Sequence, residues 1–166
     1  VRMWQLDRPT VQERRSRVMA GVEPRCPVTA VGAGLDEDWP AALREAGHDP
    51  AQRTVWYVEG VLFYLPEVVA RGVLASAAAA SAPGSALAVD LVDPDVFAFP
   101  GMRTLLARLA AAGSPWQFAT AAPAQVVEDA GWRVGDVVEP GSPGADFGRW
   151  PAAWALDAVT ERPHTY

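Results

Sequence analysis

The chain has 166 residues, half of them hydrophobic and a fifth of them charged, which suits one globular domain of ordinary size and argues against disorder. Its 14 basic residues are outnumbered by 20 acidic ones, giving a net charge of -6, whereas nucleic-acid-binding domains usually carry a basic face. One cysteine and two histidines exclude an internal disulfide and disfavour a metal site. We therefore expect neither a nucleic-acid partner nor a bound metal.

The longest uncharged stretch, residues 72–89, is mostly alanine and serine and contains Pro83-Gly84. A membrane-spanning helix is therefore not predicted there. The first residues of the chain also lack the basic and then apolar layout of a secretory signal. From these two features we expect a cytoplasmic protein with no membrane partner.

Strand and helix patterns alternate along the whole chain. Runs of β-branched and apolar residues predict the strands, and prolines or glycines mark the helix ends. The predicted strands cover residues 2–6, 27–31, 54–58, 86–92, 133–138 and 154–159. The predicted helices cover residues 11–20, 38–45, 66–82, 102–112 and 123–130. This alternation predicts an α/β fold with a mostly parallel sheet and helices on both of its faces.

Ligands of such sheets bind outside the carboxyl ends of the strands, and Asp7 follows the first predicted strand. A carboxylate there can accept hydrogen bonds from the ribose of a nucleotide-like cofactor, or it can serve as a turn or helix-capping residue. The second strand ends in Gly32-Ala33-Gly34-Leu35-Asp36, a glycine-containing loop that suits a cofactor but also suits an ordinary turn. Glu37 stands where a dinucleotide fingerprint has its third glycine, which disfavours NAD and FAD.

Glu59 ends the third predicted strand, and Tyr64 follows five residues later. This pair fits a ligand cleft, and it fits equally well an exposed acid beside a packed aromatic ring. Asp90 interrupts the fourth predicted strand and Asp93 follows it; the two could bind a cation, although solvated turn carboxylates are commoner. His48 lies in a polar turn and is predicted to be exposed.

Three longer stretches together resemble the leucine carboxyl methyltransferase superfamily, in particular its bacterial polyketide O-methyltransferase-like branch. Gln5-Leu6-Asp7-Arg8-Pro9 also resembles that family's Glu-Val-Asp-x-Pro segment. The three stretches are Asp38-Trp39-Pro40-Ala41-Ala42-Leu43-Arg44-Glu45-Ala46-Gly47-His48-Asp49-Pro50, Thr54-Val55-Trp56 and Glu59-Gly60-Val61-Leu62-Phe63-Tyr64-Leu65-Pro66.

The resemblance implies a Rossmann-like class I methyltransferase that uses S-adenosyl-L-methionine, with a sheet in the order 3-2-1-4-5-7-6. It implies that Asp7 holds the ribose, that Gly34 and Leu35 face the adenine, and that Glu59 lies near the methionine part. Tyr64 would border the pocket for a small-molecule acceptor, methylated on a carboxylate or a hydroxyl. Methyl transfer to a carboxylate needs in-line positioning more than a base, because the nucleophile is already ionised. No catalytic residue is therefore assigned.

The chain departs from the family at three places. Gln5 and Gly34 replace an expected glutamate and aspartate, and the family's glycine-rich motif, with the N-terminal helices and first strand, would precede Val1. We therefore expect residues 1–166 to form a single, partial methyltransferase domain with impaired activity. The absence of a central strand would leave sheet edges unpaired, which favours self-association.

Three other interpretations remain open. The chain could be a non-catalytic remnant or a partner subunit of a methyltransferase-like fold. Alternatively, Gly-Ala-Gly-Leu-Asp could itself be the glycine-rich first motif, which would make Glu59 the ribose ligand. The weakest interpretation is a nucleotide-binding oxidoreductase that relies on Gly32 and Gly34.

Overall fold

The computed structural model describes residues 1–139 and residue 145. The chain forms two compact units. The first unit contains residues 1–56 and 72–87, and the second contains residues 57–71 and the chain from residue 88 onward. Within the described residues, no helix is long and apolar enough to cross a bilayer.

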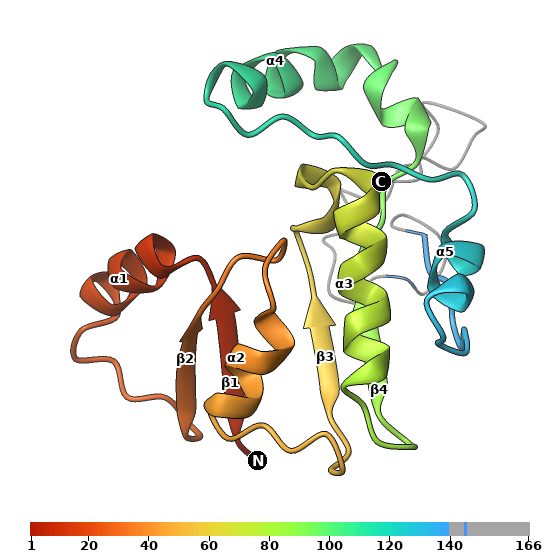
Figure 1. The fold of residues 1–166 in the computed structure, drawn as a ribbon. Coiled ribbons are helices and arrows are strands. Elements are labelled where there is room, and N and C mark those ends of the chain that lie inside the picture. Colours follow the sequence, from red (N-terminus) through yellow and green to blue (C-terminus); the bar gives the residue numbers. More distant parts are fainter. Residues whose placement is uncertain (140–144, 146–166) are drawn as a thin grey trace. The chain divides into compact units, whose positions relative to one another are not determined.

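The first unit begins with a β-α-β segment. Strand β1 (Met3–Asp7) pairs in parallel with β2 (Val28–Gly32), and the register runs from Met3 opposite Val28 to Asp7 opposite Gly32 (Figure 1). Helix α1 (Pro9–Val18) lies between them in sequence, as a parallel pair requires a long crossover connection. The buried side chain of Gln12 on this helix donates from Nε2 to the carbonyls of Gln5 (2.5 Å) and Val31 (3.4 Å). One side chain therefore holds α1 against both strands.

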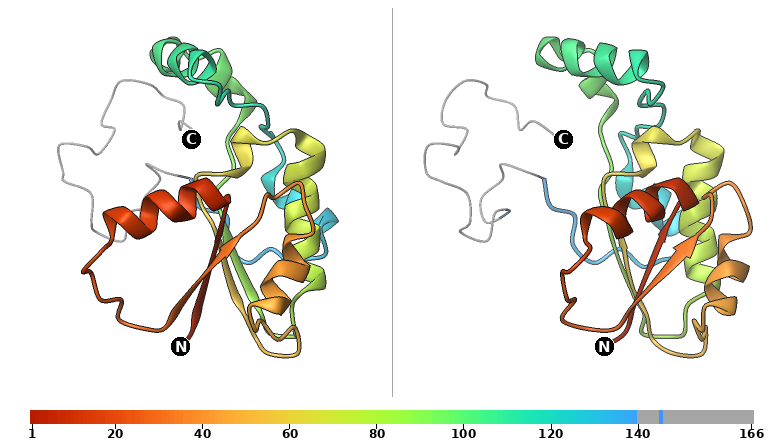
Figure 2. Two further views of the ribbon diagram at one scale, coloured as in Figure 1. Left: turned by 60° about the vertical axis from the view of Figure 1, so that its left-hand side comes forward. Right: turned by 90° about the vertical axis from the view of Figure 1, so that its left-hand side faces the viewer.

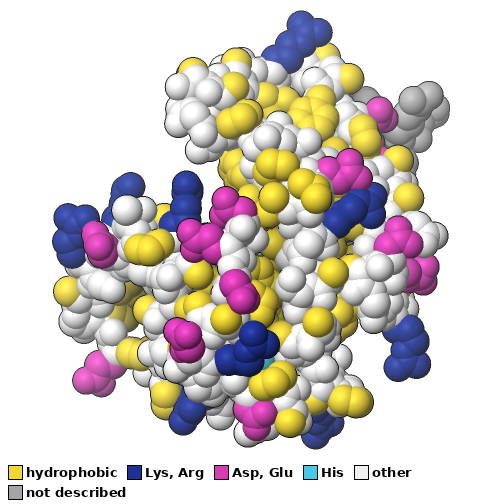
Figure 3. All heavy atoms as spheres, in the orientation of Figure 1, with side chains coloured by type: hydrophobic (Ala, Val, Ile, Leu, Met, Phe, Trp, Pro, Cys, Tyr) yellow, Lys and Arg dark blue, Asp and Glu magenta, His cyan; other side chains and the backbone are white. Residues whose placement is uncertain are grey.

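Helix α1 is otherwise a polar helix. It begins at a proline, which fits the first helical turn because the missing N–H would have no partner there. Arg14, Arg15 and Arg17 belong to it, and Figure 3 shows basic side chains gathered over this helix. Its polar surface explains why a charged sequence pattern predicted a surface helix here.

Helix α2 (Trp39–Glu45) follows β2 and is capped by its own sequence. The Asp38 carboxylate accepts a hydrogen bond from the Ala41 amide at 3.1 Å, which satisfies one of the free N–H groups of the first turn. Trp39 and Leu43 are buried. This helix therefore supplies much of the apolar core of the first unit.

Aromatic rings from distant segments meet around His48. Its ring centroid lies 5.4 Å from Trp4 and 5.5 Å from Trp56, and Trp56 lies 5.8 Å from Trp39. His48 Nε2 lies 3.1 Å from the Thr54 hydroxyl. The side chain is only 6% exposed, so the prediction of an exposed histidine is wrong. The rings of Trp4 and Trp56 pack against the imidazole and exclude water from a histidine that lies in a polar turn.

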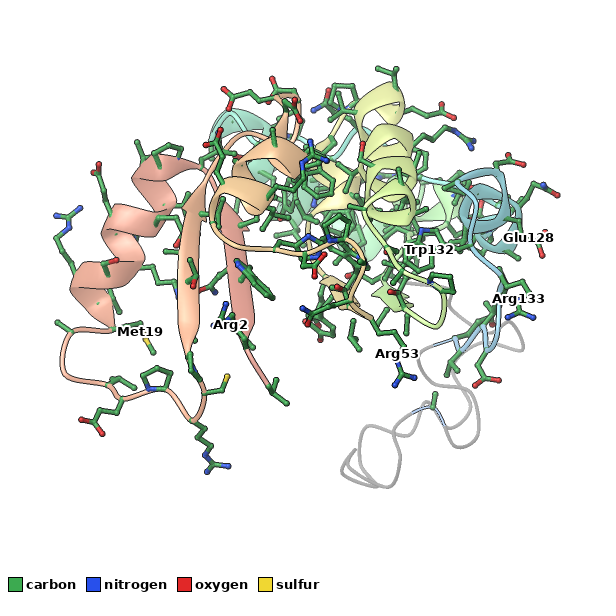
Figure 4. All side chains as sticks on the ribbon, turned by 60° about the horizontal axis from the view of Figure 1, so that its bottom comes forward. Arg2, Met19, Arg53, Glu128, Trp132 and Arg133 are labelled. Atoms are coloured by element: carbon green, nitrogen blue, oxygen red, sulfur yellow. The ribbon has the colours of Figure 1, made fainter. Side chains whose placement is uncertain are left out.

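This cluster has a charged rim at the start of β1. Figure 4 shows Arg2 beside the first residues of that strand. Its guanidinium carbon lies 5.8 Å from the ring centroid of Trp4, within the range of a cation–π contact. The indole N–H of Trp4 donates to the Ala46 carbonyl at 3.0 Å. The cluster is therefore fixed by polar contacts as well as by ring packing.

A second two-stranded sheet consists of β3 (Val55–Val58) and β4 (Ala86–Val89). The Ala86 amide donates to Thr54 O at 3.0 Å and the Asp90 amide donates to Val58 O at 3.3 Å. The two bonds advance by four residues on each strand, which is the pattern of parallel strands, and both views in Figure 2 show β3 beside β4. The 3₁₀ helix η1 (Leu62–Tyr64) and helix α3 (Glu67–Ala79) lie between these strands in sequence. Parallel strands with helical connections confirm the predicted α/β class.

The second unit continues after β4 with short helices. These are η2 (Pro94–Phe97), η3 (Pro100–Met102), α4 (Arg103–Ala111) and α5 (Pro123–Asp129). Arg71 pairs with Glu67 on the next turn of α3 at 2.8 Å and with Asp129 at the end of α5 at 3.7 Å. These exposed ion pairs contribute little individually, because water screens them.

One predicted strand is wrong and another lies outside the described residues. Residues 133–138 form no strand, although three of the six are valine. A strand needs a neighbour to satisfy its backbone groups, and no strand of the described chain pairs with this segment. The predicted strand at residues 154–159 lies beyond the part of the chain that the structure describes. The predicted fourth strand is also shorter than expected, since β4 ends at Val89.

Candidate functional site

Asp7 and the glycine-containing loop lie together in the first unit. Asp7 is the last residue of β1, its register partner is Gly32, and its carbonyl accepts from the Ala33 amide at 3.0 Å. The exposed Asp7 carboxylate accepts one hydrogen bond through Oδ1, from the Arg8 amide at 2.8 Å. The carboxyl ends of β1 and β2 therefore present an accessible carboxylate next to a tight loop, as the sequence predicted.

The loop after β2 is closed by a carboxylate of its own. The Gly34 amide donates to Glu37 Oε2 at 3.0 Å, and the Glu37 amide donates back to the Gly34 carbonyl at 3.1 Å. A Cβ at position 34 would lie 2.6 Å from Asp36 Oδ1 and 3.2 Å from Glu37 Cδ. Only glycine fits this position without displacing those carboxylates. Gly34 is buried and Leu35 is partly exposed, so Leu35 presents the more accessible surface.

Glu59 and its neighbours lie in the second unit. Glu59 directly follows β3, is exposed, and accepts a hydrogen bond through Oε2 from the Tyr57 hydroxyl at 2.5 Å. This bond to a carboxylate, followed by partial desolvation, raises the pKa of Tyr57 above its usual value. The contact with Tyr57 restrains the Glu59 side chain through Oε2. Its other carboxylate oxygen, Oε1, could accept a hydrogen bond from a ligand.

Asp90 binds the residue that follows Glu59. Both of its carboxylate oxygens accept from the Gly60 amide, at 2.9 Å and 3.0 Å. Burial raises the pKa of Asp90, the bond from Gly60 lowers it, and the nearby negative charge of Glu59 raises it; the net direction is upward. Among the sequence interpretations of Asp90, the structure supports neither a cation ligand nor a purely solvated residue. The contact joins residues thirty positions apart, which no local pattern could have indicated.

Tyr64 lies in an aromatic cluster of the second unit. Its ring centroid lies 4.9 Å from Phe63 and 6.2 Å from Trp116, and Phe63 lies 4.3 Å from Trp116. Val92 and Val96 are buried in the same cluster. Tyr64 itself is partly exposed, so its ring belongs to both the cluster and the surface.

A later stretch of chain, residues 116–120, crosses this cluster and is here named the crossing segment. The Gln117 amide donates to Phe63 O at 2.6 Å, and Gln117 Nε2 donates to Tyr64 O at 2.7 Å. The Thr120 amide donates to Val92 O at 2.9 Å. Sequence reasoning missed these residues, because their partners are more than fifty positions away or lie on another element.

The structure thus groups the predicted site residues by unit. Asp7 lies with Gly34 and Leu35 in the first unit, and Glu59 and Tyr64 lie in the second. The alternative that makes Gly-Ala-Gly-Leu-Asp the first motif is not favoured by the strand pairing. In that reading the strand before the glycines would be the neighbour of β3, whereas β2 pairs with β1 and β3 pairs with β4.

Comparison with known proteins supports the predicted resemblance. Residues 1–78 match the model of the leucine carboxyl methyltransferase family. This match contains β1, the loop after β2, Glu59 and Tyr64, which are the elements that carry the motifs. The predicted resemblance to the leucine carboxyl methyltransferase family is therefore confirmed for residues 1–78.

Named relatives agree with this match. A protein of Mycolicibacterium vanbaalenii, named "Putative S-adenosyl-L-methionine-dependent methyltransferase", is 41% identical over 114 residues, which is 68% of this chain and 37% of that protein. A protein of Mycobacterium marinum with the same name is 44% identical over 97 residues, covering 55% of this chain and 30% of the relative. The chain thus spans about a third of the length of the relatives it matches, 37% of the first and 30% of the second.

A solved structure shows the fold. A DUF574 family protein from Streptomyces avermitilis superimposes with a TM-score of 0.67, covering 90% of this chain and 60% of that protein, at 18% sequence identity. At this low identity the likeness concerns the fold alone. It confirms a mixed α/β architecture of the predicted class.

Proposed function

We propose, on the premise that residues 1–78 are leucine carboxyl methyltransferase-like, that this chain is part of an S-adenosyl-L-methionine-dependent O-methyltransferase. Its substrate would be a small molecule with a carboxylate or hydroxyl group. The observation that carries the proposal is the exposed Asp7 carboxylate at the end of β1, beside the tight loop at Gly34. In parallel α/β sheets this is the place where an acidic residue binds a ribose.

The residues present suit the proposed cofactor. Asp7 keeps one carboxylate oxygen outside its bond to Arg8, and a ribose diol would donate to that oxygen. Leu35 offers an apolar surface for adenine. Gly34 has no side chain, so the loop backbone could approach the adenine closely. Glu59 supplies a negative charge for the methionine ammonium group, and one of its oxygens is outside the bond to Tyr57.

When bound, S-adenosyl-L-methionine supplies an electrophilic methyl group. The remaining work of this chain would be to orient the two reactants. A carboxylate acceptor is ionised at neutral pH, so no residue has to remove a proton from it. Tyr64 would border the acceptor, and the apolar rings of Phe63 and Trp116 beside it would exclude water from that side.

Calorimetric titration of the purified chain with S-adenosylhomocysteine tests this proposal. We expect a micromolar dissociation constant, about 8 kcal/mol of binding free energy. Asp7→Asn should weaken binding about tenfold, since a hydrogen bond to a charged group is worth about 1.5–3 kcal/mol. Glu23→Gln removes the same charge from an exposed position of the same unit and should change nothing. A folded chain that gives no binding heat refutes the proposal.

We further propose that both units belong to one methyltransferase domain located in the cytoplasm. Three elements, β3, α3 and β4, continue from one unit into the other, which supports a single domain. Limited proteolysis tests this point: a single domain should resist cleavage within these elements. Two separately stable fragments would contradict it.

A second candidate function is a non-catalytic chain that associates with itself or with a partner. Within the described residues, β1 has only β2 as a hydrogen-bonded neighbour, and β3 has only β4. Free strand edges readily pair with other strands. Size-exclusion chromatography with light scattering tests this function: a clean monomer that binds S-adenosylhomocysteine would exclude an obligate partner.

A further inference from the structure

Asp90 holds the end of β3 by two separate contacts. Its backbone amide donates to Val58 O, the last residue of β3, at 3.3 Å. Its carboxylate then accepts from the Gly60 amide through both oxygens, at 2.9 Å and 3.0 Å. The residue between these two anchors is Glu59. Asp90 therefore fixes the backbone on both sides of the proposed ligand of the methionine ammonium group.

Gly60 is the place where the chain would otherwise be free to move. Its φ is +67°, a conformation that glycine adopts readily and other residues adopt rarely. No atom lies within 4 Å of the position that a Cβ would occupy, so side-chain packing does not restrain this residue. The bond to Asp90 therefore restrains Gly60, which lies between Glu59 and η1, the element that carries Tyr64.

We infer that Asp90 is a positioning residue of the proposed cofactor site, which acts by fixing Gly60 and thereby orients Glu59 and the turn that carries Tyr64. This inference rests on the proposed function. Asp90 itself need not touch either reactant. Its carboxylate binds the Gly60 amide in place of water and so holds one backbone conformation between Glu59 and Tyr64.

The contact accounts for the buried charge at this position. A half-buried carboxylate costs free energy unless hydrogen bonds compensate it, and an amide bonded to both oxygens provides such compensation. A neutral side chain of the same shape would fit the space but would bind the amide less strongly. The negative charge of Asp90 therefore serves to strengthen the bond that fixes the backbone at Gly60.

Three variants distinguish a role of Asp90 in positioning Gly60 from an effect of net charge and from an effect on folding. Asp90→Ala removes both contacts to Gly60, and Asp90→Asn keeps one carbonyl oxygen in the same shape. Asp93→Asn is the matched control, because Asp93 lies three residues away and its carboxylate accepts from the Asp95 amide (2.8 Å) within its own turn. Each variant is measured by NMR amide exchange at Gly60 and by calorimetric titration with S-adenosylhomocysteine.

We expect Asp90→Ala to accelerate hydrogen exchange of the Gly60 amide. It should also raise the dissociation constant for S-adenosylhomocysteine about tenfold. Asp90→Asn should give an intermediate loss, and Asp93→Asn should stay within twofold of the unaltered chain. The pH profile provides a further readout. The affinity of the unaltered chain for S-adenosylhomocysteine should fall on acidification. Asp90→Asn should lack the part of this fall that is due to Asp90. The nearby titratable groups Tyr57 and Glu59 are present in both chains, so they do not account for the difference.

Several outcomes would overturn the inference. If Asp90→Ala exchanges faster at Gly60 but binds with unchanged affinity, Asp90 is a structural residue only. If Asp93→Asn weakens binding as much, net charge and not position is responsible. If Asp90→Ala does not fold, unchanged affinity and an unchanged pH profile in Asp90→Asn refute the inference. If the folded, unaltered chain binds no S-adenosylhomocysteine, the proposed function fails, and the inference fails with it even where the exchange data show the contact to Gly60.

Discussion

The aromatic cluster around His48 leads to a quantitative prediction about stability. His48→Ala removes a ring that is 6% exposed and packed between Trp4 and Trp56. It also removes the hydrogen bond to the Thr54 hydroxyl. One such bond contributes about 1 kcal/mol, the edge contact with Trp4 about 0.5–1.5 kcal/mol, and the cavity adds a further cost. The free energy of unfolding should therefore fall by about 2–4 kcal/mol, in line with other large-to-small core substitutions.

Urea denaturation followed by tryptophan fluorescence measures this loss, because two tryptophans, Trp4 and Trp56, contact the substituted ring. His48→Gln is the matched variant, since it retains a polar group that can reach the Thr54 hydroxyl and leaves a smaller cavity. It should lose less stability than His48→Ala. A loss below about 0.5 kcal/mol in His48→Ala, within the range of ordinary surface substitutions, would show that the cluster does not depend on His48.

The same residue predicts a dependence of stability on pH. Burial lowers the pKa of His48, with Asp49 opposing this effect and Arg44 adding to it. The unfolded chain therefore binds a proton at His48 more readily than the folded chain does. Stability should be fully present above the unfolded value of about 6.5 and should decrease as the pH falls from there towards the lower folded pKa. Stability measured from pH 8 to pH 5 should show this decrease in the unaltered chain, and His48→Gln should lack it.

Two further substitutions test the candidate site. Gly34→Ala places a Cβ 2.6 Å from an Asp36 carboxylate oxygen. It should weaken the binding of S-adenosylhomocysteine in calorimetry and lower the free energy of unfolding by about 1–3 kcal/mol. An unchanged affinity together with an unchanged stability would refute the tight-loop argument. Glu59→Gln removes the charged acceptor of the Tyr57 hydroxyl, so the pKa of Tyr57 should fall towards its usual value in an absorbance titration. An unchanged titration would mean that the two side chains do not interact in solution.

Local sequence patterns predicted most of the helices and strands, because runs of β-branched residues and the prolines and glycines at helix ends depend only on neighbouring residues. Five of the predicted helices and four of the predicted strands occur in the structure, with ends that shift by a few residues. The places of Asp7 and Glu59 at the ends of their strands could be predicted because a residue at a strand end can be located once the strand is known. Their roles in binding stay predictions. The strand predicted at residues 133–138 is wrong, because β-branched residues alone do not provide the neighbouring strand that their backbone groups need.

Contacts between distant segments could not be predicted in this way. The burial of His48 depends on Trp4 and Trp56, and nothing in its own turn indicates either partner. The bond between Asp90 and Gly60 requires the parallel pairing of β3 with β4 in one particular register. Such features follow from tertiary structure, and a single sequence carries no direct record of them.

The crossing segment has a consequence for the order in which the second unit folds. Its bonds from Gln117 reach back to Phe63 and Tyr64, and its bond from Thr120 reaches back to Val92. Contacts with such long sequence separation close large loops, which slows folding. During synthesis, the carbonyls of Phe63 and Tyr64 must therefore remain hydrated until about fifty more residues have been added. The aromatic surface around Tyr64 is thus one of the last parts of the described chain to become closed.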